Sequence, residues 1–523
     1  MNRFLKRANK RISLGTAAAL LAGTSFLGIF LGILRTKLIN ANFNVFTSDA
    51  YFAAFKIPDF IFFTLASGAL GVAFIPILSD RLAKNKQSAW EVASYILNFL
   101  GLIALVSSIL LMIFADPLMR YVVAPGFTPQ QLELSVSIMR IVSVNVFIFS
   151  ISTILSTVQQ AVGRFFFIAI APLFYNASII ASIFIFGDSL GVVGLSLGVA
   201  FGAILQLLVV ALGMAGLSFT YSPTIDFKNK SFREVLRVLP ARAIDQGIDS
   251  INAIVETRFA SRLITGSVTW YENALVLHYA PISLIGNSIS TAAFPRLTDR
   301  LAQGRVDLFR KEFVMVLRTM IWIALPVVVV SFFARAYLAR IIFARSSSEI
   351  AMIFGFLCVA IFFRIIYTII SRYFYAHKDT KTPLYVSLFV IALNIYLAYT
   401  LSQPTAYGVA GLAIAQSIVA LTEVMILVVI MIRRDRKRFT RDLLQAVTRM
   451  VAITGFTAVA TYITIQYFPL LQSDIGSVLV AKLIIIAAVT FTVHTAMSYI
   501  FDMPEAKTVV RKAKNMALAV IKV

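Results

Sequence analysis

Residues 76–83 read PILSDRLA, and residues 295–302 read PRLTDRLA, with six of the eight positions identical. Two further echoes keep nearly the same spacing: GVVGL at 191–195 recurs as GVAGL at 408–412, and Asn176 recurs as Asn394. The three separations are 219, 217 and 218 residues. Because chance rarely preserves one offset at three places, the chain contains an internal repeat.

The composition is that of a membrane protein. Hydrophobic residues make up 59% of the 523 positions, charged residues make up 14%, and the mean hydropathy is +0.87. Soluble proteins carry about 25% charged residues. Fourteen apolar stretches reach the length of about 20 residues that crosses a bilayer: 14–34, 50–78, 91–115, 133–158, 165–187, 190–217, 236–262, 268–294, 313–334, 350–371, 383–402, 408–432, 447–468 and 476–501.

Each echo lies within or at the end of one of these stretches, so the repeat unit is a bundle of membrane helices. Parallel repeats of this kind are typical of transporters that rock one half against the other. We therefore predict an all-α polytopic membrane protein with about fourteen transmembrane helices. They form two six-helix lobes from the repeat, followed by two added C-terminal helices.

The net charge of +23 would suggest nucleic acid as a partner of a soluble protein. The 47 basic residues instead alternate along the loops. If the N-terminus is cytoplasmic, inner segments carry 32 of them and outer loops carry 7, among them Arg335, Arg340 and Arg345. This asymmetry follows the positive-inside rule and predicts that both termini are cytoplasmic. Nucleic acid is a poor fit, because the basic groups are dispersed along one headgroup plane.

These patterns predict a linear organisation of the chain. A basic cytoplasmic N-terminus (1–13) precedes the first lobe (14–217), a cytoplasmic linker (218–235), the second lobe (236–432), a basic linker (433–446), two further spans (447–501) and an amphipathic cytoplasmic tail (502–523). The densest basic cluster, RRDRKR at 433–438, is expected to contact anionic lipids.

Sequence motifs for catalysis are missing. We find no nucleotide-binding loop, no metal-ligand spacing and no nucleophile motif, and the paired glycines lie in apolar helices where small residues allow close packing. The single cysteine, Cys358, excludes an internal disulfide and a cysteine metal cluster. We therefore expect no enzyme activity and no bound metal or cofactor.

Polar groups at bilayer depth are the candidates for function, because each is costly there unless it faces a cavity or a partner. The seventh predicted span is the most polar. Its charged and amide residues are spaced 3, 4, 3 and 4 apart, on one helical face about 21 Å long: Arg242, Asp245, Asp249, Asn252 and Glu256. A buried ladder in which Arg242 pairs with an aspartate of its own helix is one interpretation. The length of the stripe favours the other, a water-filled cavity.

Two other spans add candidates. Glu272 and His278 lie in the eighth span. In the second span, Asp49 and Lys56 are seven residues apart and would share a helical face, with a break expected just beyond them at Pro58. A charge pair followed by a proline predicts a bending helix beside a cavity.

Six short segments share their pattern with a known family: LGILR at 31–35, DAYFAAFKIPD at 49–59, SGALGVAFIPIL at 67–78, VAPGF at 123–127, GSVTW at 266–270 and AAFPRL at 292–297. Together they resemble the MurJ (MviN) family, the lipid II flippases of the multidrug/oligosaccharidyl-lipid/polysaccharide exporter superfamily. The resemblance covers essentially the whole chain. It implies a V-shaped pair of six-helix lobes, an amphiphilic central cavity, and a groove beside the last two spans for a polyprenyl tail.

By this resemblance, Arg35 matches the family's arginine on the first span, and Asp49 matches its aspartate at the start of the second. Three further cavity arginines of the family, and an acidic residue that commonly follows the first arginine, have no counterpart. Their places hold Ile29, Phe62, Val276 and Thr36.

The resemblance implies a flippase of the bacterial cytoplasmic membrane that moves an undecaprenyl-pyrophosphate-linked peptidoglycan precursor, lipid II, from the inner to the outer leaflet by alternating access. An anionic pyrophosphate needs cations in a cavity of low dielectric. The candidates here are Arg35, Lys56 and Arg242. The other polar residues of the seventh span would bind sugar hydroxyls or hold Arg242 in place.

Three alternatives stay open. A cation-coupled drug or metabolite antiporter of the same superfamily would use a carboxylate-rich cavity, for which the chain offers Asp245, Asp249, Glu256 and Glu272. A flippase for another polyprenyl-linked glycan would share the fold, whereas a membrane scaffold would have no use for charges at bilayer depth. The expected partners are the lipid-linked substrate, anionic membrane lipids and other cell-wall synthesis proteins. A coupling ion and the membrane potential both remain open as driving forces.

Overall fold

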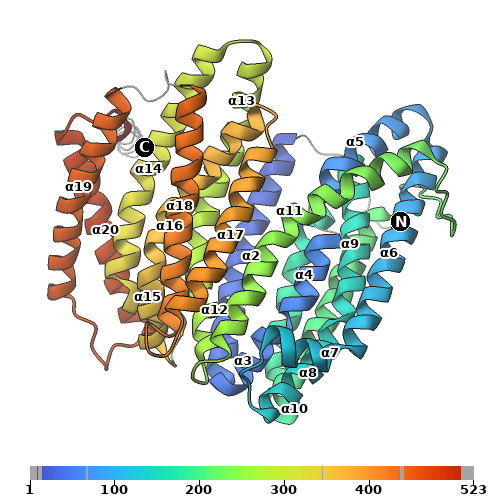
Figure 1. Ribbon diagram of the computed structural model, residues 1–523, viewed down its shortest axis with the longest axis horizontal. Helices are drawn as coiled ribbons and strands as arrows, with labels where there is room; N and C mark the ends of the chain where they lie inside the picture. Colours follow the sequence, from blue (N-terminus) through green and yellow to red (C-terminus); the bar gives the residue numbers. More distant parts are fainter. Residues whose placement is uncertain (1–8, 10–13, 66–68, 344, 436–440, 508–523) are drawn as a thin grey trace, which may run out of the picture. The chain divides into compact units, whose positions relative to one another are not determined.

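A computed structural model describes residues 9, 14–65, 69–343, 345–435 and 441–507 (Figure 1). Every regular element in these ranges is a helix, and ten helices are long and apolar enough to cross a membrane. One of them, α10 (Phe166–Met214), has 49 residues and is interrupted by non-helical backbone at Gly191, so it contains two predicted spans. The predicted class, an all-α polytopic membrane protein, is confirmed, and the helices are compatible with fourteen spans.

The chain forms two compact units, residues 1–269 and 270–523. Unit 1 contains α2 (Leu14–Asn42), α3 (Val45–Ala54), α4 (Lys56–Leu65), α5 (Ala69–Lys84), α6 (Lys86–Ile113), α7 (Ala115–Pro117), η1 (Leu118–Val123), α8 (Pro129–Val142), α9 (Val144–Ala161), α10 and α11 (Lys230–Ala260). Its core includes Phe74, Trp90, Ile154 and Phe232, from α5, α6, α9 and α11. Helix α11, the seventh predicted span, therefore packs inside unit 1. The predicted lobes, residues 14–217 and 236–432, are defined by the sequence repeat and not by these contacts, so their boundaries stay predictions.

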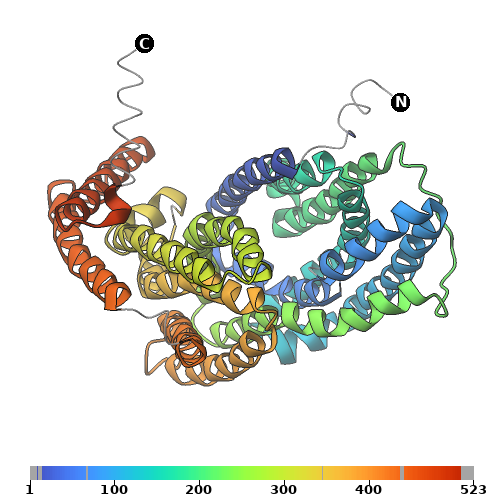
Figure 2. The same cartoon turned by 90° about the horizontal axis from the view of Figure 1, so that it is seen from above.

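Unit 2 begins within α12 (Ser267–Pro281) and continues through η2 (Ile282–Asn287), α13 (Ser288–Ala302), α14 (Val306–Phe333), α15 (Arg335–Ile342), α16 (Ser347–Ala376), α17 (Lys381–Leu401), α18 (Val409–Arg434), α19 (Arg441–Tyr467) and α20 (Gly476–Ile500). Helix α18 packs against α16 and α17, and α16 packs against α14. Helices α19 and α20 form a pair that packs against α14, shown in red beside it in Figure 2.

The backbone repeats the sequence echoes. Gly191 has φ 55° and ψ −138°, and Gly408 has φ 54° and ψ −134°. Three residues further on, both copies also need a glycine. A Cβ on Gly194 would lie 2.4 Å from Phe186 Cβ, and one on Gly411 would lie 2.0 Å from the Leu401 carbonyl oxygen. In both units the first glycine adopts a positive φ, and the glycine three residues later allows a close approach that a Cβ would block. This shared pattern supports the internal duplication.

Replacing Gly408 by alanine tests the conformational half of this argument. No heavy atom lies within 4 Å of the added Cβ, so the cost comes from the left-handed backbone alone. We expect a loss of about 1–3 kcal/mol in the free energy of unfolding. The matched control is Gly455→Ala in α19, which also has open space but helical backbone. It should gain about 0.5–1 kcal/mol. Equal melting temperatures of the two purified variants in detergent would contradict the strain at Gly408.

The second predicted span is interrupted earlier than expected. Helix α3 ends at Ala54, Phe55 is the break, and Pro58 lies in the first turn of α4. The reason is that a proline ring conflicts with the carbonyl four residues before it, here that of Ala54. The prediction that the helix breaks beyond Lys56 is therefore wrong, and Asp49 and Lys56 lie on different helices.

Candidate functional site

Arg35 lies near the end of α2 in unit 1 and is half-buried. Its NH1 donates to the Asn176 Oδ1 of α10 at 3.1 Å. The Asn176 Nδ2 in turn donates to the Pro172 carbonyl at 3.1 Å, so its amide oxygen is directed to the arginine. Helices α2 and α10 pack against each other and fix this geometry. The arginine is therefore oriented by a neutral amide.

Two tyrosines lie within electrostatic range of this arginine. Arg35 and Asp59 are both within electrostatic range of the phenols of Tyr51 and Tyr175. These groups come from α2, α3, α4 and α10. The structure thus brings the predicted Arg35 to Asn176, which is 141 residues away in the sequence and could not be paired with it by helical periodicity.

Phe62 of α4 fills one of the places that the resemblance assigns to an arginine. Its ring centroid lies 5.5 Å from that of Phe149, which lies 5.3 Å from that of Tyr175. The lost cation is therefore replaced by the first ring of an aromatic row. This row continues through Phe149 to Tyr175, whose phenol is within electrostatic range of Arg35.

Asp49 has a structural contact of its own. Its carboxylate is 1% exposed and accepts hydrogen bonds from the Gly266 N–H at 2.6 Å, the Thr269 N–H at 2.8 Å and the Thr269 hydroxyl at 2.7 Å. Thr269 lies in the first turn of α12, and Gly266 is the residue just before this helix. Asp49 therefore caps the start of α12 and ties α3 to it.

Lys56, the other charged candidate of the second predicted span, lies half-buried on α4.

The predicted stripe of the seventh span lies on one continuous helix, α11. The side chains of Arg242, Asp245 and Asp249 lie outside the described part of the structure. At the other end of the stripe, the Asn252 Nδ2 donates to the Glu256 Oε1 at 3.1 Å, and Glu256 is 3% exposed. At this end, two residues of the stripe are therefore hydrogen-bonded to each other. The cavity predicted along the rest of the stripe stays a prediction.

In unit 2, His278 of α12 belongs to a network that sequence reasoning missed. Its buried imidazole lies within electrostatic range of Arg364. The Arg364 NH1 lies 2.8 Å from the Glu423 Oε2. The other carboxylate oxygen accepts from the Ser387 hydroxyl at 3.0 Å. Glu423 is an acidic residue inside the apolar helix α18, and an ionisable residue at bilayer depth is the signal that could have identified it. Glu272 is half-buried on α12.

Most other cations predicted inside the spans have partners within their own unit. Two donate to backbone carbonyls and two form ion pairs: Arg140 with Met112 O (3.3 Å), Arg258 with Val122 O (3.0 Å) and Tyr121 O, Arg318 with Glu505 (2.7 Å), and Lys482 with Asp474 (2.7 Å). These contacts explain the charges structurally. Arg35 differs from them, because it is the family-matched cation and its partner is a neutral side chain.

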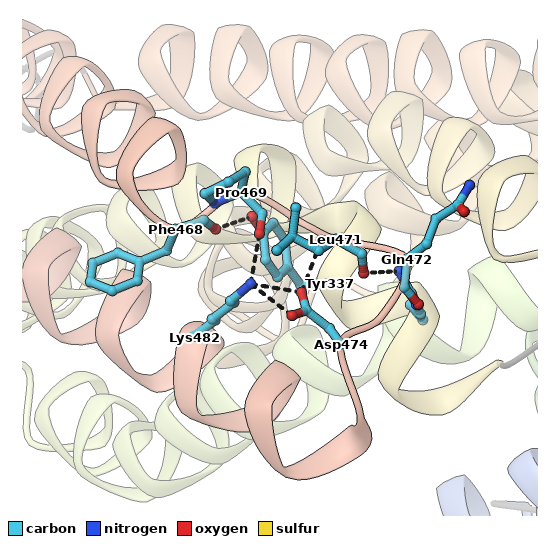
Figure 3. Close-up of polar contacts among 8 residues, drawn as sticks. Tyr337, Phe468, Pro469, Leu471, Gln472, Asp474 and Lys482 are labelled. Atoms are coloured by element: carbon cyan, nitrogen blue, oxygen red, sulfur yellow. Dashed lines mark hydrogen bonds and ion pairs between the residues drawn. The ribbon is translucent and has the colours of Figure 1, made fainter.

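The Lys482–Asp474 pair joins α20 to the loop between α19 and α20 (Figure 3). Lys482 Nζ also donates to the Pro469 carbonyl at 2.7 Å, and its hydrogen bond holds the pKa of the Asp474 carboxyl below its usual range. From α15, the Tyr337 hydroxyl donates to the Phe468 carbonyl at 2.6 Å. Arg340 donates to the carbonyls of Leu471, at 2.7 Å, and of Gln472. Side chains of α15 therefore hold the α19–α20 loop through the backbone carbonyls of the loop.

An apolar groove of about 580 Å³ lies in unit 2 between α14, α16, α18 and α19. Its lining is aliphatic apart from one methionine sulfur, and contains Leu317, Ile321, Ile366, Ile370, Val424, Met425, Val428, Ile432, Leu443, Leu444 and Val447. A surface of this composition binds hydrocarbon, because it offers hydrophobic contact without hydrogen-bonding groups.

Comparison with known proteins places these features in context. A family model described as "Lipid II flippase MurJ" matches residues 41–481. The probable lipid II flippase MurJ of Borreliella burgdorferi is 25% identical over 464 residues, which cover 87% of this chain and 89% of that protein. Its counterpart from Buchnera aphidicola subsp. Acyrthosiphon pisum is 28% identical over 380 residues, covering 70% and 73%.

Two solved structures have a similar fold. One is described as lipid II flippase MurJ in an inward closed conformation, with a TM-score of 0.77 and 23% identity over 92% of this chain and 98% of that one. The other is an inward-facing multidrug resistance MATE family transporter of the MOP superfamily, with a TM-score of 0.66 and 18% identity over 79% and 96%.

Proposed function

Because the chain belongs to the MurJ family of lipid II flippases, we propose that its substrate is lipid II, the undecaprenyl-pyrophosphate-linked precursor of peptidoglycan. We further propose that alternating access carries the headgroup from the inner to the outer leaflet, with both termini in the cytoplasm. Family membership itself makes the protein a multi-pass membrane transporter, and not a catalyst.

One observation carries the choice of an anionic substrate: Arg35 is oriented by the Asn176 amide. An arginine that is paired with a carboxylate offers little net charge to a ligand. Here none of the ion pairs found in the described residues includes Arg35, so no salt bridge among them competes with a pyrophosphate. Arginine also matches phosphate geometry through paired N–H donors.

The apolar groove of unit 2 supports the lipid part of the proposal. A polyprenyl tail consists of branched hydrocarbon, and the groove presents branched aliphatic side chains from α14, α16, α18 and α19. A tail held there would stay in a hydrocarbon environment while the polar headgroup moves.

The Asp49 contacts lie within unit 1 and hold the start of α12, the helix that continues into unit 2. The carboxylate binds the start of α12 through two backbone amides and one hydroxyl, so the contact depends on the relative position of α3 and α12. We propose that this tie stabilises one conformation of the transport cycle and breaks in another. The strength of the three bonds then sets the population of the tied state.

Replacing Asn176 by aspartate tests the carrying observation. The two side chains have nearly the same shape, but aspartate would pair with Arg35 and cancel its charge. We expect the affinity of the purified protein for lipid II to fall at least about 10-fold. Asn176→Ala removes the hydrogen bond and leaves the charge, so it should cost only about 2- to 10-fold.

The matched control is Asn42→Asp, because Asn42 makes the same local hydrogen bond, to the Leu38 carbonyl at 2.8 Å, but is exposed. It should bind lipid II like the parent chain. Complementation of cells depleted of their own lipid II flippase gives the cellular readout. Unchanged binding by Asn176→Asp would refute a role for the Arg35 charge.

A further inference from the structure

A cavity of about 430 Å³ lies in unit 2 where α14 ends, α15 follows and α16 begins. Its walls are apolar and open: Phe332, Met352 and Phe356 line it with exposed fractions of 43%, 49% and 41%. Arg335 and Ser348 are the polar residues of the lining. Outward-facing apolar walls around a cation match an amphiphile with a negative headgroup.

The Arg335 guanidinium is held in place without being neutralised. Its NH1 donates to the Phe332 carbonyl at 2.7 Å, and its central carbon lies 4.7 Å from the centroid of the Phe332 ring. This hydrogen bond uses one of five N–H donors. Among the ion pairs of the described residues, none involves Arg335. Glu349, the carboxylate at the start of α16, accepts from the Ser348 hydroxyl at 2.6 Å and does not line the cavity.

Gly355 of α16 provides the space for this arginine. A Cβ at that position would lie 3.0 Å from the Arg335 Cδ and 3.2 Å from its Nε. These distances are shorter than ordinary van der Waals contacts, so a larger residue would displace the arginine stem. The position of Arg335 in the cavity therefore depends on a glycine in the opposite wall.

The distribution of charge along the chain does not explain why a cation stands at Arg335. Three of the seven basic residues predicted for the outer loops fall between residues 335 and 345. Cations on that side are disfavoured by the positive-inside rule, so each needs a local reason. Arg340 has one, because it binds the carbonyls of the α19–α20 loop. A bound anion would supply the reason for Arg335.

We propose that this cavity binds one anionic glycerophospholipid of the outer leaflet. The phosphate lies on the Arg335 guanidinium, and an acyl chain follows the walls formed by Phe332, Met352 and Phe356. Both parts of the lipid meet matching chemistry: arginine is a preferred partner of phosphate, and the walls exclude water from the chain. The proposal does not depend on the identity of the transported substrate.

Native mass spectrometry of the purified full chain, titrated with phosphatidylglycerol, tests the site. The parent protein should bind one lipid more tightly than the rest. Arg335→Gln should weaken this binding at least about 10-fold, and Arg335→Lys should retain part of it. Gly355→Val keeps the charge but crowds the cavity, so it should also lose the lipid. The matched control, Arg345→Gln, removes an exposed arginine outside the lining and should bind like the parent.

Two further titrations identify the occupant. Diacylglycerol has the same chains without phosphate and should fail to occupy the site. Undecaprenyl pyrophosphate should not displace phosphatidylglycerol from it, and displacement would overturn the assignment to a resident phospholipid. Equal phosphatidylglycerol binding by Arg335→Gln, Arg345→Gln and the parent chain, with all three melting alike, would reduce Arg335 to an ordinary interfacial anchor and refute the site.

Discussion

Asp49→Ala should unfold at a markedly lower temperature than the parent chain and should fail to transport. The substitution removes the acceptor of three hydrogen bonds, from Gly266 and Thr269, at a position that is 1% exposed. Each buried donor left without a partner costs about 1–3 kcal/mol. A total of about 3 kcal/mol or more is therefore expected, with thermal unfolding of the purified protein as the measurement.

Two variants separate this role from a general effect of charge. Asp49→Asn keeps one acceptor oxygen and should melt between alanine and the parent. Glu133→Ala removes an exposed carboxylate from α8 and should melt like the parent. If Asp49→Ala melts like Glu133→Ala, the tie between α3 and α12 contributes no stability, and its proposed part in the transport cycle loses its physical basis.

Arg35→Ala should weaken binding of lipid II by about 10- to 150-fold, the equivalent of a lost charge-assisted hydrogen bond to phosphate. The loss should be large because other family arginine positions hold Ile29 and Phe62. Arg35→Lys keeps the charge without the paired donors and should retain part of the function. Binding to the purified protein and complementation of flippase-depleted cells are the two measurements.

The control for this prediction is Arg140→Ala, which removes an exposed arginine that donates to the Met112 carbonyl. It should bind lipid II normally. The result that would redirect the interpretation is full complementation by Arg35→Ala together with loss on Asp249→Asn or Glu256→Gln. Because complementation requires transport of lipid II, that pattern would indicate that transport depends on the carboxylates of α11 and not on the Arg35 charge.

The architecture was largely predictable from the sequence, because hydropathy and repeated glycines act locally. Gly191 and Gly408 occur in the same short motif, and they adopt the same unusual backbone. Pro58 shows the limit of this reasoning. A proline was expected to break its helix beyond Lys56, but the conflict with the carbonyl four residues earlier moves the break back to Phe55.

The partners of the candidate residues were less predictable, because they are distant in sequence. Asp49 finds its donors more than two hundred residues away, at Gly266 and Thr269. Asn176 was recognised as an echo of Asn394, but nothing in either copy indicated that it would orient Arg35. Helical periodicity identifies which residues share a face, and only packing decides what that face meets.

The attachment of the α19–α20 loop to α15 has a consequence for how the protein evolves. Tyr337 and Arg340 bind the carbonyls of Phe468, Leu471 and Gln472, and carbonyls are the same whatever side chain follows them. The loop can therefore exchange most of its side chains while the helix pair remains docked. Selection on the attachment acts on α15 and on the Lys482–Asp474 pair, so the side chain at Gln472 can change without loss of the contact with Arg340.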